Sequence, residues 1–206
     1  MNRDVVRHML SLPFLPVLDV LGQWVCCPNP KTATGSMVGI ALSDRQILHR
    51  EGPRSWDRVW LQIIGPRLDE LFLFTFVRNP WDKVVSAFFW LQQKKRNEIA
   101  SDMSFREFVT EDLASVGTSV NRHFAEQWPT FMFCGQPIPG MFVGRFERLH
   151  EDWAYVAGRL RLPKDLPHKN VSQHGPYTDY YDDECVEIVR SLYHEEIAEL
   201  GYEFGQ

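Results

Sequence analysis

The feature that most constrains this chain is a short apolar run that leads directly into an amphipathic helix. The run, Leu71–Val77, is almost entirely apolar and lies between charged residues, which is the pattern of a short buried strand. Because proline disfavours helical geometry at the residue before it and suits a helix's first position, we expect Asn79 to cap a helix that begins at Pro80. Five apolar residues then recur at the spacing of a core-facing helix: Trp81, Val84, Val85, Phe88 and Phe89.

Polar groups gather on one side of this strand–helix junction. Arg78 leaves the strand where the helix begins, and Lys83 and Ser86 lie three residues apart opposite the apolar stripe. A guanidinium, an ammonium, a hydroxyl and a helix N-terminus together are typical of an anion site, whose natural ligand is a phosphate. The alternative is that Arg78 and Lys83 are solvated surface charges. The agreement of strand, turn and helix favours the anion site.

A second loop of similar character follows an earlier apolar run. Gln23–Cys27 has the pattern of a buried strand, Pro28–Pro30 breaks it, and Lys31-Thr32-Ala33-Thr34-Gly35-Ser36 then opens a helix marked by Met37, Ile40 and Ala41. In a strand–loop–helix unit, backbone N–H groups can cradle a phosphate. Lys31 adds charge, and three hydroxyls can donate further bonds. The spacing GxxxxGK[ST] of a Walker A motif is absent, and an ordinary capped helix start is the alternative.

Composition limits the class of protein. A chain of 206 residues with 44% hydrophobic content is long enough for one domain with a full core, which we place at residues 1–206. The net charge of −5 argues against nucleic acid as a partner. Four cysteines without a CxxC pattern or metal-ligand spacing predict reduced thiols in a cytoplasmic protein without a metal. The apolar run Met9–Leu21 contains two prolines and Asp19 and is too short to span a membrane.

The rest of the chain alternates strands and helices. We expect a strand at Arg45–His49, a helix at Ser55–Ile64, a strand at Met141–Gly144, and helices at Glu147–Leu162 and Asp182–Leu200. Residues 98–140 are too irregular for the sheet and suit an insertion that covers the substrate. This alternation predicts an α/β fold with a parallel sheet covered by helices on both faces. Ligands of such folds bind at the carboxyl ends of the strands, where both loops and His49 fall.

The ordered set of motifs resembles the sulfotransferase family that uses 3′-phosphoadenosine 5′-phosphosulfate, in particular its carbohydrate-type and bacterial branch. Pro30–Ser36 resembles the family's 5′-phosphosulfate loop, and Phe76–Ser86 closely resembles its 3′-phosphate motif. Later signatures follow in the family's order: Val143–Glu147, Pro167–Ser172, Tyr180–Asp183 and Gly201–Phe204. The resemblance runs from about residue 24 to the C-terminus and implies a three-layer, P-loop-like fold.

The resemblance also implies a reaction and a donor site. The expected activity is in-line transfer of a sulfonyl group from 3′-phosphoadenosine 5′-phosphosulfate to the hydroxyl or amine of a small-molecule or carbohydrate acceptor, with no metal. Lys31 and the loop stabilise the charge on the departing phosphate. The implied donor-binding residues are Lys31, Thr32, Ala33, Thr34, Gly35, Ser36, Arg78 and Ser86. Aromatic residues of the insertion that could stack on an acceptor are Phe124, Trp128, Phe131 and Phe133.

The base that takes the acceptor's proton is one of three residues. His49 lies between the two phosphate motifs at an expected strand end, where several sulfotransferases place their catalytic histidine. His123 lies in the acceptor region and is the second candidate, and Glu51 is a carboxylate alternative. For each histidine the competing interpretation is a surface or hydrogen-bonded structural role.

Two positions depart from the family pattern. The family loop commonly reads Lys-Thr-Ala-Gly-Thr-Ser, whereas Thr34 and Gly35 stand here in inverted order, so a phosphate-facing hydroxyl is lost or moved by one residue. Lys83 replaces the more usual arginine, which keeps the charge but not the planar fork of donors. Two other classes stay open: a non-catalytic member that binds nucleotide or a partner protein, which the inverted loop supports, and a P-loop-type kinase, against which the missing Walker A pattern weighs.

Overall fold

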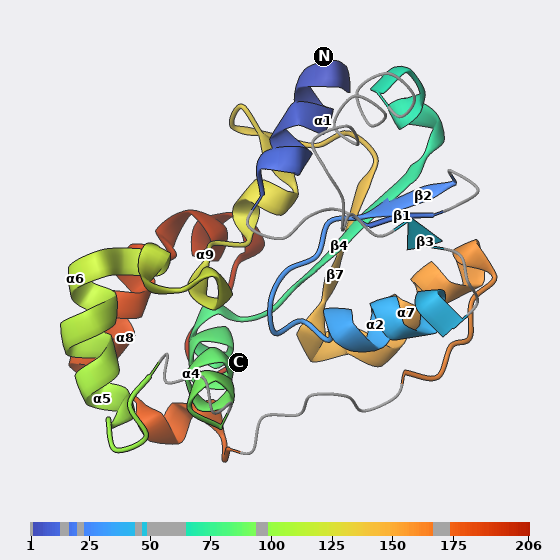
Figure 1. Ribbon diagram of the computed structural model, residues 1–206. Coiled ribbons are helices and arrows are strands. Elements are labelled where there is room, and N and C mark those ends of the chain that lie inside the picture. Colours follow the sequence, from blue (N-terminus) through green and yellow to red (C-terminus); the bar gives the residue numbers. More distant parts are fainter. Residues whose placement is uncertain are drawn as a thin grey trace. The chain divides into compact units, whose positions relative to one another are not determined.

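The chain forms two compact units in the computed structural model. The structure describes residues 2–12, 17–19, 23–43, 47–48, 65–93, 99–166 and 174–206. The first unit comprises Met1–Val77 and Gln127–Lys169, and the second comprises Arg78–Glu126 and Asn170–Gln206. Figure 1 shows the elements of both units.

The first unit contains a five-stranded sheet in the order β3-β1-β2-β4-β7. Its strands are β1 (Val17–Asp19), β2 (Trp24–Cys26), β3 (Ile47–Leu48), β4 (Phe72–Val77) and β7 (Met141–Arg145). Strands β2, β4 and β7 are parallel, whereas β1 is antiparallel to both β2 and β3. The expected parallel sheet is therefore confirmed for β2, β4 and β7 and is wrong for β1 and β3. The sequence did not indicate β1, because a three-residue strand is too short to show a period of two.

The two faces of this sheet bury separate apolar clusters. On one face, residues such as Val25, Cys27 and Leu73 pack with Val5, Val6 and Met9 of α1 (Asn2–Ser11). On the other, Trp24, Cys26, Phe74 and Phe76 pack with side chains of α2 (Thr34–Ser43) and α7 (Leu149–Leu160). Figure 1 shows α1 on one side of the sheet and α2 with α7 on the other. The helix–sheet–helix layering agrees with the predicted α/β class.

Short elements complete the first unit. They are the 3-10 helices η2 (Gly65–Glu70), η6 (Trp128–Thr130) and η7 (Phe146–Arg148), and a hairpin of β5 (Met132–Phe133) and β6 (Gln136–Pro137). Cys134 and Gly135, at the hairpin turn, have φ angles of 51° and 72°, as a two-residue type I′ turn requires.

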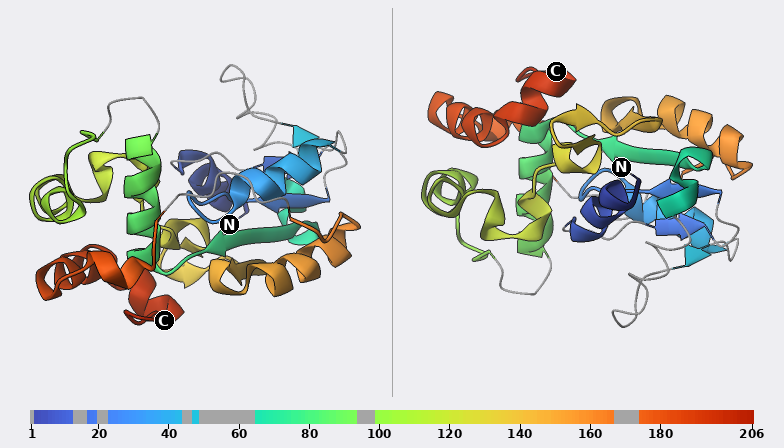
Figure 2. Two further views of the ribbon diagram at one scale, coloured as in Figure 1. Left: turned by 90° about the horizontal axis from the view of Figure 1, so that it is seen from below. Right: turned by 90° about the horizontal axis from the view of Figure 1, so that it is seen from above.

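The described part of the second unit is helical. It contains α4 (Pro80–Gln93), α5 (Phe105–Glu107), α6 (Ala114–Val116), α8 (Asp183–Leu192) and α9 (His194–Leu200). Between α5 and α6 lies η3 (Phe108–Leu113), which has π-helical turns, and the 3-10 helices are η4 (Gly117–Val120), η5 (Arg122–Phe124) and η8 (Tyr177–Tyr180). Figure 2 shows α4, the α5–α6 segment and α8 as neighbouring helices. Their core is aromatic, with Phe88 in ring contact with Phe105 and Phe108.

Some of the predicted element boundaries are confirmed, and others differ from the structure. Strand β4 and the start of α4 at Pro80 agree with the predicted strand and helix. The predicted C-terminal helix is instead two helices, because the φ angle of −113° and ψ of 25° at Tyr193 end α8 before α9 begins. The 98–140 segment is divided, with its part up to Glu126 in the second unit and its part from Gln127 in the first. The predicted helix at Ser55–Ile64 lies outside the described residues.

Gly144 of β7 allows a close approach of two strands. It pairs directly with Phe76 of β4, and a Cβ atom at this position would lie 2.5 Å from Cε1 of the Phe76 ring. Phe76 is buried in the cluster beneath α2 and α7, so its ring has little room to move. Glycine at position 144 is therefore a packing requirement.

We predict that Gly144→Ala lowers the free energy of unfolding by about 1–3 kcal/mol, the usual effect of overpacking a core. The matched control is Gly158→Ala in α7, where a new Cβ would meet no atom within 4 Å. That change should raise the stability by about 0.5–1 kcal/mol, because alanine favours the helix. Urea unfolding of both variants measures the difference, and equal effects would contradict the assigned role of Gly144.

Candidate functional site

The Lys31 loop (Pro30–Ser36) follows β2 and has an unusual backbone. Lys31 and Ala33 have φ angles of 63° and 60°, whereas Thr32 between them has no positive φ. Alternating handedness of this kind turns successive N–H groups toward one side, the geometry of an anion-binding nest. The N–H groups of Ser36 and Met37 donate to the Ala33 carbonyl at 2.9 and 3.2 Å, which joins the loop to α2. The local structure agrees with the predicted strand, loop and helix start.

Asn29, which the sequence analysis treated only as part of a chain break, lies buried beneath the loop with 2% of its surface exposed. Its amide nitrogen is 3.1 Å from Thr75 Oγ1, 3.0 Å from the Phe76 carbonyl and 3.0 Å from Thr130 Oγ1. Thr75 donates to the Cys27 carbonyl at 2.7 Å. The loop is thereby tied to β4 and to η6. A polar residue beside two prolines was the available signal, but the sequence does not show that it is buried.

The loop threonines face inward. Thr32 and Thr34 donate their hydroxyl hydrogens to the Asn29 carbonyl at 2.9 and 2.8 Å, and their oxygens lie 3.1 Å apart. The expectation that three hydroxyls stand ready to donate to a phosphate is therefore not met for these two. Ser36 is buried and Lys31 is half-buried. In this geometry the loop can offer an anion its backbone N–H groups and the Lys31 ammonium.

In the second unit, Arg78 is engaged by an acidic residue of α4, the helix that begins two residues after it. Its Nε and Nη2 donate to the two carboxylate oxygens of Asp82 at 2.7 and 2.8 Å. The guanidinium carries five N–H donors, of which Asp82 accepts two. Asp82 also lies in the first turn of α4, where a negative charge is favourable. A phosphate at Arg78 would have to bind against the charge of this carboxylate.

Asn79 caps α4 as predicted. Its Oδ1 accepts the Trp81 N–H at 3.1 Å, and its Nδ2 donates to the Glu203 carbonyl at 3.0 Å. Tyr181 donates to the Trp81 carbonyl at 2.9 Å, and Phe204 makes an edge contact with the Trp81 ring. The later signatures Tyr180–Asp183 and Gly201–Phe204 thus pack on the turn that begins α4, which gives them a structural role within the second unit.

Lys83 differs from its expected place. It is fully buried, and its Nζ donates to the Ala125 carbonyl at 2.6 Å and lies 3.8 Å from the buried carboxylate of Glu196. The ring of Tyr193 lies 4.6 Å away, and the Tyr193 hydroxyl donates to the Phe124 carbonyl at 2.6 Å. Burial lowers the pKa of Lys83, against the opposing effect of Glu196. Lys83 is therefore a buried ion-pair partner and does not lie on an exposed anion-binding face.

The remaining candidate site residues lie in different parts of the chain. Ser86 is buried in α4 with 1% of its surface exposed, on the same helix as Lys83. His123 lies in η5, where its backbone N–H donates to Asn121 Oδ1 at 3.0 Å and its ring lies 4.5 Å from that of Trp90. The second unit therefore contains Arg78, Ser86 and His123, and the first contains the Lys31 loop. His49 and Glu51 lie outside the described residues.

The cysteines offer no nucleophile within the sheet. Cys26 and Cys27 belong to the two opposite apolar clusters, as adjacent strand residues should. All four cysteines are free, in agreement with the predicted reduced thiols. Burial raises the pKa of Cys27 to about 12, so its reactive thiolate form is suppressed at neutral pH.

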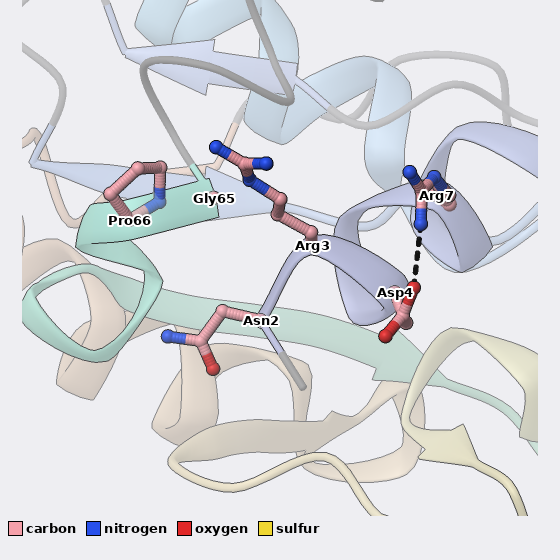
Figure 3. A pocket seen from close by; sticks show the side chains of 6 residues that line it. All are labelled: Asn2, Arg3, Asp4, Arg7, Gly65 and Pro66. Atoms are coloured by element: carbon pink, nitrogen blue, oxygen red, sulfur yellow. Dashed lines mark hydrogen bonds and ion pairs between the residues drawn. The ribbon is translucent and has the colours of Figure 1, made fainter.

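A hollow of about 530 Å³ lies beside α1 and contains none of the predicted site residues (Figure 3). Asn2, Arg3, Asp4, Arg7, Gly65 and Pro66 line it. Arg7 pairs with Asp4 at 2.7 Å. Within the described residues, no three His, Cys, Asp or Glu side chains come together as a metal site requires. Of the helices in the described ranges, none has the length and apolar character needed to cross a bilayer.

Comparison with known proteins identifies a family. Residues 42–203, more than half of the chain, match the family described as the sulfotransferase family. An uncharacterized protein of Archaeoglobus fulgidus is 31% identical over 104 residues, which cover 50% of this chain and 79% of that relative. No solved structure matches the chain. The matched range includes the Arg78–Ser86 motif and His123, but it begins after the Lys31 loop.

We predict that Lys83→Met lowers the free energy of unfolding by about 3–5 kcal/mol, because it leaves the buried Glu196 carboxylate without its ammonium partner. Adding Glu196→Gln should recover much of this loss. Lys164→Met changes an exposed lysine and should shift stability by no more than about 0.5 kcal/mol. Urea unfolding at pH 7 makes the comparison, and a loss for Lys83→Met as small as that control would contradict the buried pair.

The same variants have a pH signature. Because burial lowers the pKa of Lys83 below its ordinary 10.5, the unfolded chain binds this proton more tightly than the folded chain. The stability of the wild type should therefore rise relative to that of Lys83→Met/Glu196→Gln as pH increases toward 10.5. A constant difference across that window would show that the pKa is not lowered.

Proposed function

Because this chain belongs to the sulfotransferase family, we propose that it transfers a sulfonyl group from 3′-phosphoadenosine 5′-phosphosulfate to an acceptor hydroxyl by in-line displacement. The acceptor class is a carbohydrate or a small molecule, and no metal takes part. The observation that carries this proposal is the Lys31 loop, in which a lysine and a backbone of alternating handedness immediately precede α2. Such a loop suits the 5′-phosphosulfate of the donor.

The loop's task in this reaction is electrostatic. As the bond between the sulfonyl group and the phosphate oxygen breaks, negative charge builds on that oxygen. Lys31 and the loop N–H groups at the start of α2 stabilise this charge, and they act more strongly on the transition state than on the bound donor. Thr32 and Thr34 keep the loop in shape through the Asn29 carbonyl. We assign Ala33, Gly35 and Ser36 to the same phosphate cradle.

Arg78 and Ser86 are assigned to the 3′-phosphate of the donor. The support is the family match, which includes both residues, and the guanidinium held by Asp82 in a fixed orientation. A guanidinium is suited to bidentate contacts with phosphate. The nearby Asp82 carboxylate opposes the anion, so Arg78 contributes discrimination between nucleotides more than raw affinity.

The base is assigned to His49, with His123 as the alternative and Glu51 as a carboxylate candidate. His49 falls between the two motifs in the sequence, directly after β3 (Ile47–Leu48). His123 has a described environment beside Trp90, in the segment assigned to acceptor binding. Either imidazole can take the acceptor's proton near neutral pH.

We predict that Lys31→Ala lowers kcat by about tenfold or more while it weakens binding of 3′-phosphoadenosine 5′-phosphate only slightly, because the lysine acts on charge that develops in the transition state. Arg78→Ala is the contrasting variant. It should weaken binding of the 3′-phosphorylated nucleotide by about tenfold or more and leave binding of the dephospho form unchanged, because a charge-assisted contact to the 3′-phosphate is lost.

Release of 3′-phosphoadenosine 5′-phosphate from a labelled donor, with a panel of acceptors, measures turnover, and calorimetry measures binding. Wild-type protein that binds the nucleotide but never turns over would indicate a non-catalytic member. Binding of ATP with magnesium in preference to the sulfonyl donor would indicate a kinase. Either result would overturn the proposed function.

We predict that His49→Ala reduces kcat by about a hundredfold or more, with donor affinity nearly unchanged, and removes the acid limb of the pH–rate profile. His123→Ala is the matched control and should mainly raise the KM of the acceptor. An exchange of these two phenotypes would assign the base to His123. If neither variant changes kcat, the proton passes to Glu51 or to solvent.

A further inference from the structure

Asn29 is a buried polar residue to whose side chain neither the family motifs nor the proposed mechanism gives a role. We infer that Asn29 is a positioning residue, which holds the Lys31 loop in the conformation that presents its lysine and N–H groups to an anion. The inference rests on the proposed function for the identity of that anion. It depends on three features of the first unit: the bonds of the Asn29 amide, the bonds of its carbonyl, and the strain of the loop.

The amide of Asn29 is anchored to the rigid part of the unit. Its two hydrogens meet three acceptors, at 3.1, 3.0 and 3.0 Å. Thr75 and the Phe76 carbonyl belong to β4, and Thr130 belongs to η6. The side chains of Asn29, Thr75 and Thr130 are all buried, so water does not compete for these bonds. The position of Asn29 is thus determined by β4 and η6.

The backbone carbonyl of Asn29 stabilises the conformation of the loop. It accepts the hydroxyls of Thr32 and Thr34 at 2.9 and 2.8 Å. These two residues alternate with Lys31 and Ala33, which have φ angles of 63° and 60°. A residue other than glycine costs about 1–2 kcal/mol in this conformation. The hydroxyl bonds to Asn29 help to offset that cost, because they close turns that contain Lys31 and Ala33.

Asn29 therefore connects the sheet to the loop through one residue. Its side-chain amide is bonded to β4, and its backbone carbonyl is bonded to residues 32 and 34. The position of β4 therefore determines the position of the loop. Removing the amide leaves the Thr75 and Thr130 hydroxyls with the bonds that they donate to the Cys27 and Gln127 carbonyls, each at 2.7 Å. The threonines beneath the loop then keep these bonds, while the loop loses its anchor. A change at Asn29 should accordingly affect the function of Lys31 more than the folding of the unit.

The test is a double-mutant cycle between Asn29 and Lys31, with stability measured separately. Asn29→Ala should lower kcat with the sulfonyl donor by about tenfold or more at a temperature where circular dichroism shows the folded state. Lys31→Ala should then lower kcat much less in the Asn29→Ala background than in the wild type, because the lysine is already misplaced. Additive losses would overturn the inference, as would an Asn29→Ala variant that loses only thermal stability.

Two further variants sharpen the comparison. Asn29→Asp keeps the shape of the side chain but places a carboxylate against the Phe76 carbonyl. Neither group can donate a hydrogen bond to the other, so this variant should impair turnover at least as much as Asn29→Ala. Thr130→Val removes one of the three acceptors and leaves the two on β4, so its kcat should stay within about twofold of the wild type. A Thr130→Val loss equal to that of Asn29→Ala would point to general damage of the core.

Amide hydrogen exchange separates this inference from the proposed function. Exchange at residues 32–36 should accelerate by about tenfold or more in Asn29→Ala, while exchange in β4 stays unchanged, whether or not the protein turns over a sulfonyl donor. If the wild type shows no turnover but the exchange result holds, the proposed function fails and the positioning role survives. Unchanged exchange in the loop would overturn the positioning role even in an active enzyme.

Discussion

The pairing of β4 with β2 on one side and β7 on the other is the constraint on which the first unit depends. A parallel strand that pairs along both edges must bury both its faces, and Phe72–Val77 has the nearly continuous apolar sequence that this requires. The pairing also determines where polar groups can enter. Thr75 is the one hydroxyl in β4, and it bonds to the Cys27 carbonyl and to the Asn29 amide. The strand thus determines both the core and the path of the chain after β2.

Each unit encloses a polar network, and the two networks have different physical character. Beneath the Lys31 loop, the network is neutral and links an amide to hydroxyls and carbonyls. In the second unit it is ionic, with Lys83 and Glu196 both fully buried. A buried ion pair contributes little net stability but is damaging to break. Lys83 and Tyr193 bond to the consecutive carbonyls of Ala125 and Phe124, so this network holds the segment that carries His123.

The elements that the sequence predicted well share one property: their signals are local. The apolar run of β4 and the Asn79-Pro80 cap of α4 depend on neighbouring residues, and the structure has both. The pattern Gln23–Cys27 likewise predicted β2. What the sequence could not show depends on residues far apart in the chain. The bonds of Asn29 reach 46 to 101 positions along the sequence, and the partners of Lys83 lie directly after η5 and in α9. Local periodicity predicted Lys83 on the polar face of its helix. Periodicity carries no information about the Glu196 carboxylate on another helix, which allows the Lys83 charge to be buried.

The inverted order of Thr34 and Gly35 leaves the left-handed positions of the loop at Lys31 and Ala33. If the loop required glycine for a left-handed residue, the inversion would move that residue and change the path of the chain. In this structure Ala33 and Lys31 occupy the left-handed conformation, and Gly35 lies within α2. Thr34 instead uses its hydroxyl to bond back to Asn29. The left-handed residues of this loop therefore do not depend on the position of glycine, and a side-chain bond from Thr34 helps to fix the backbone.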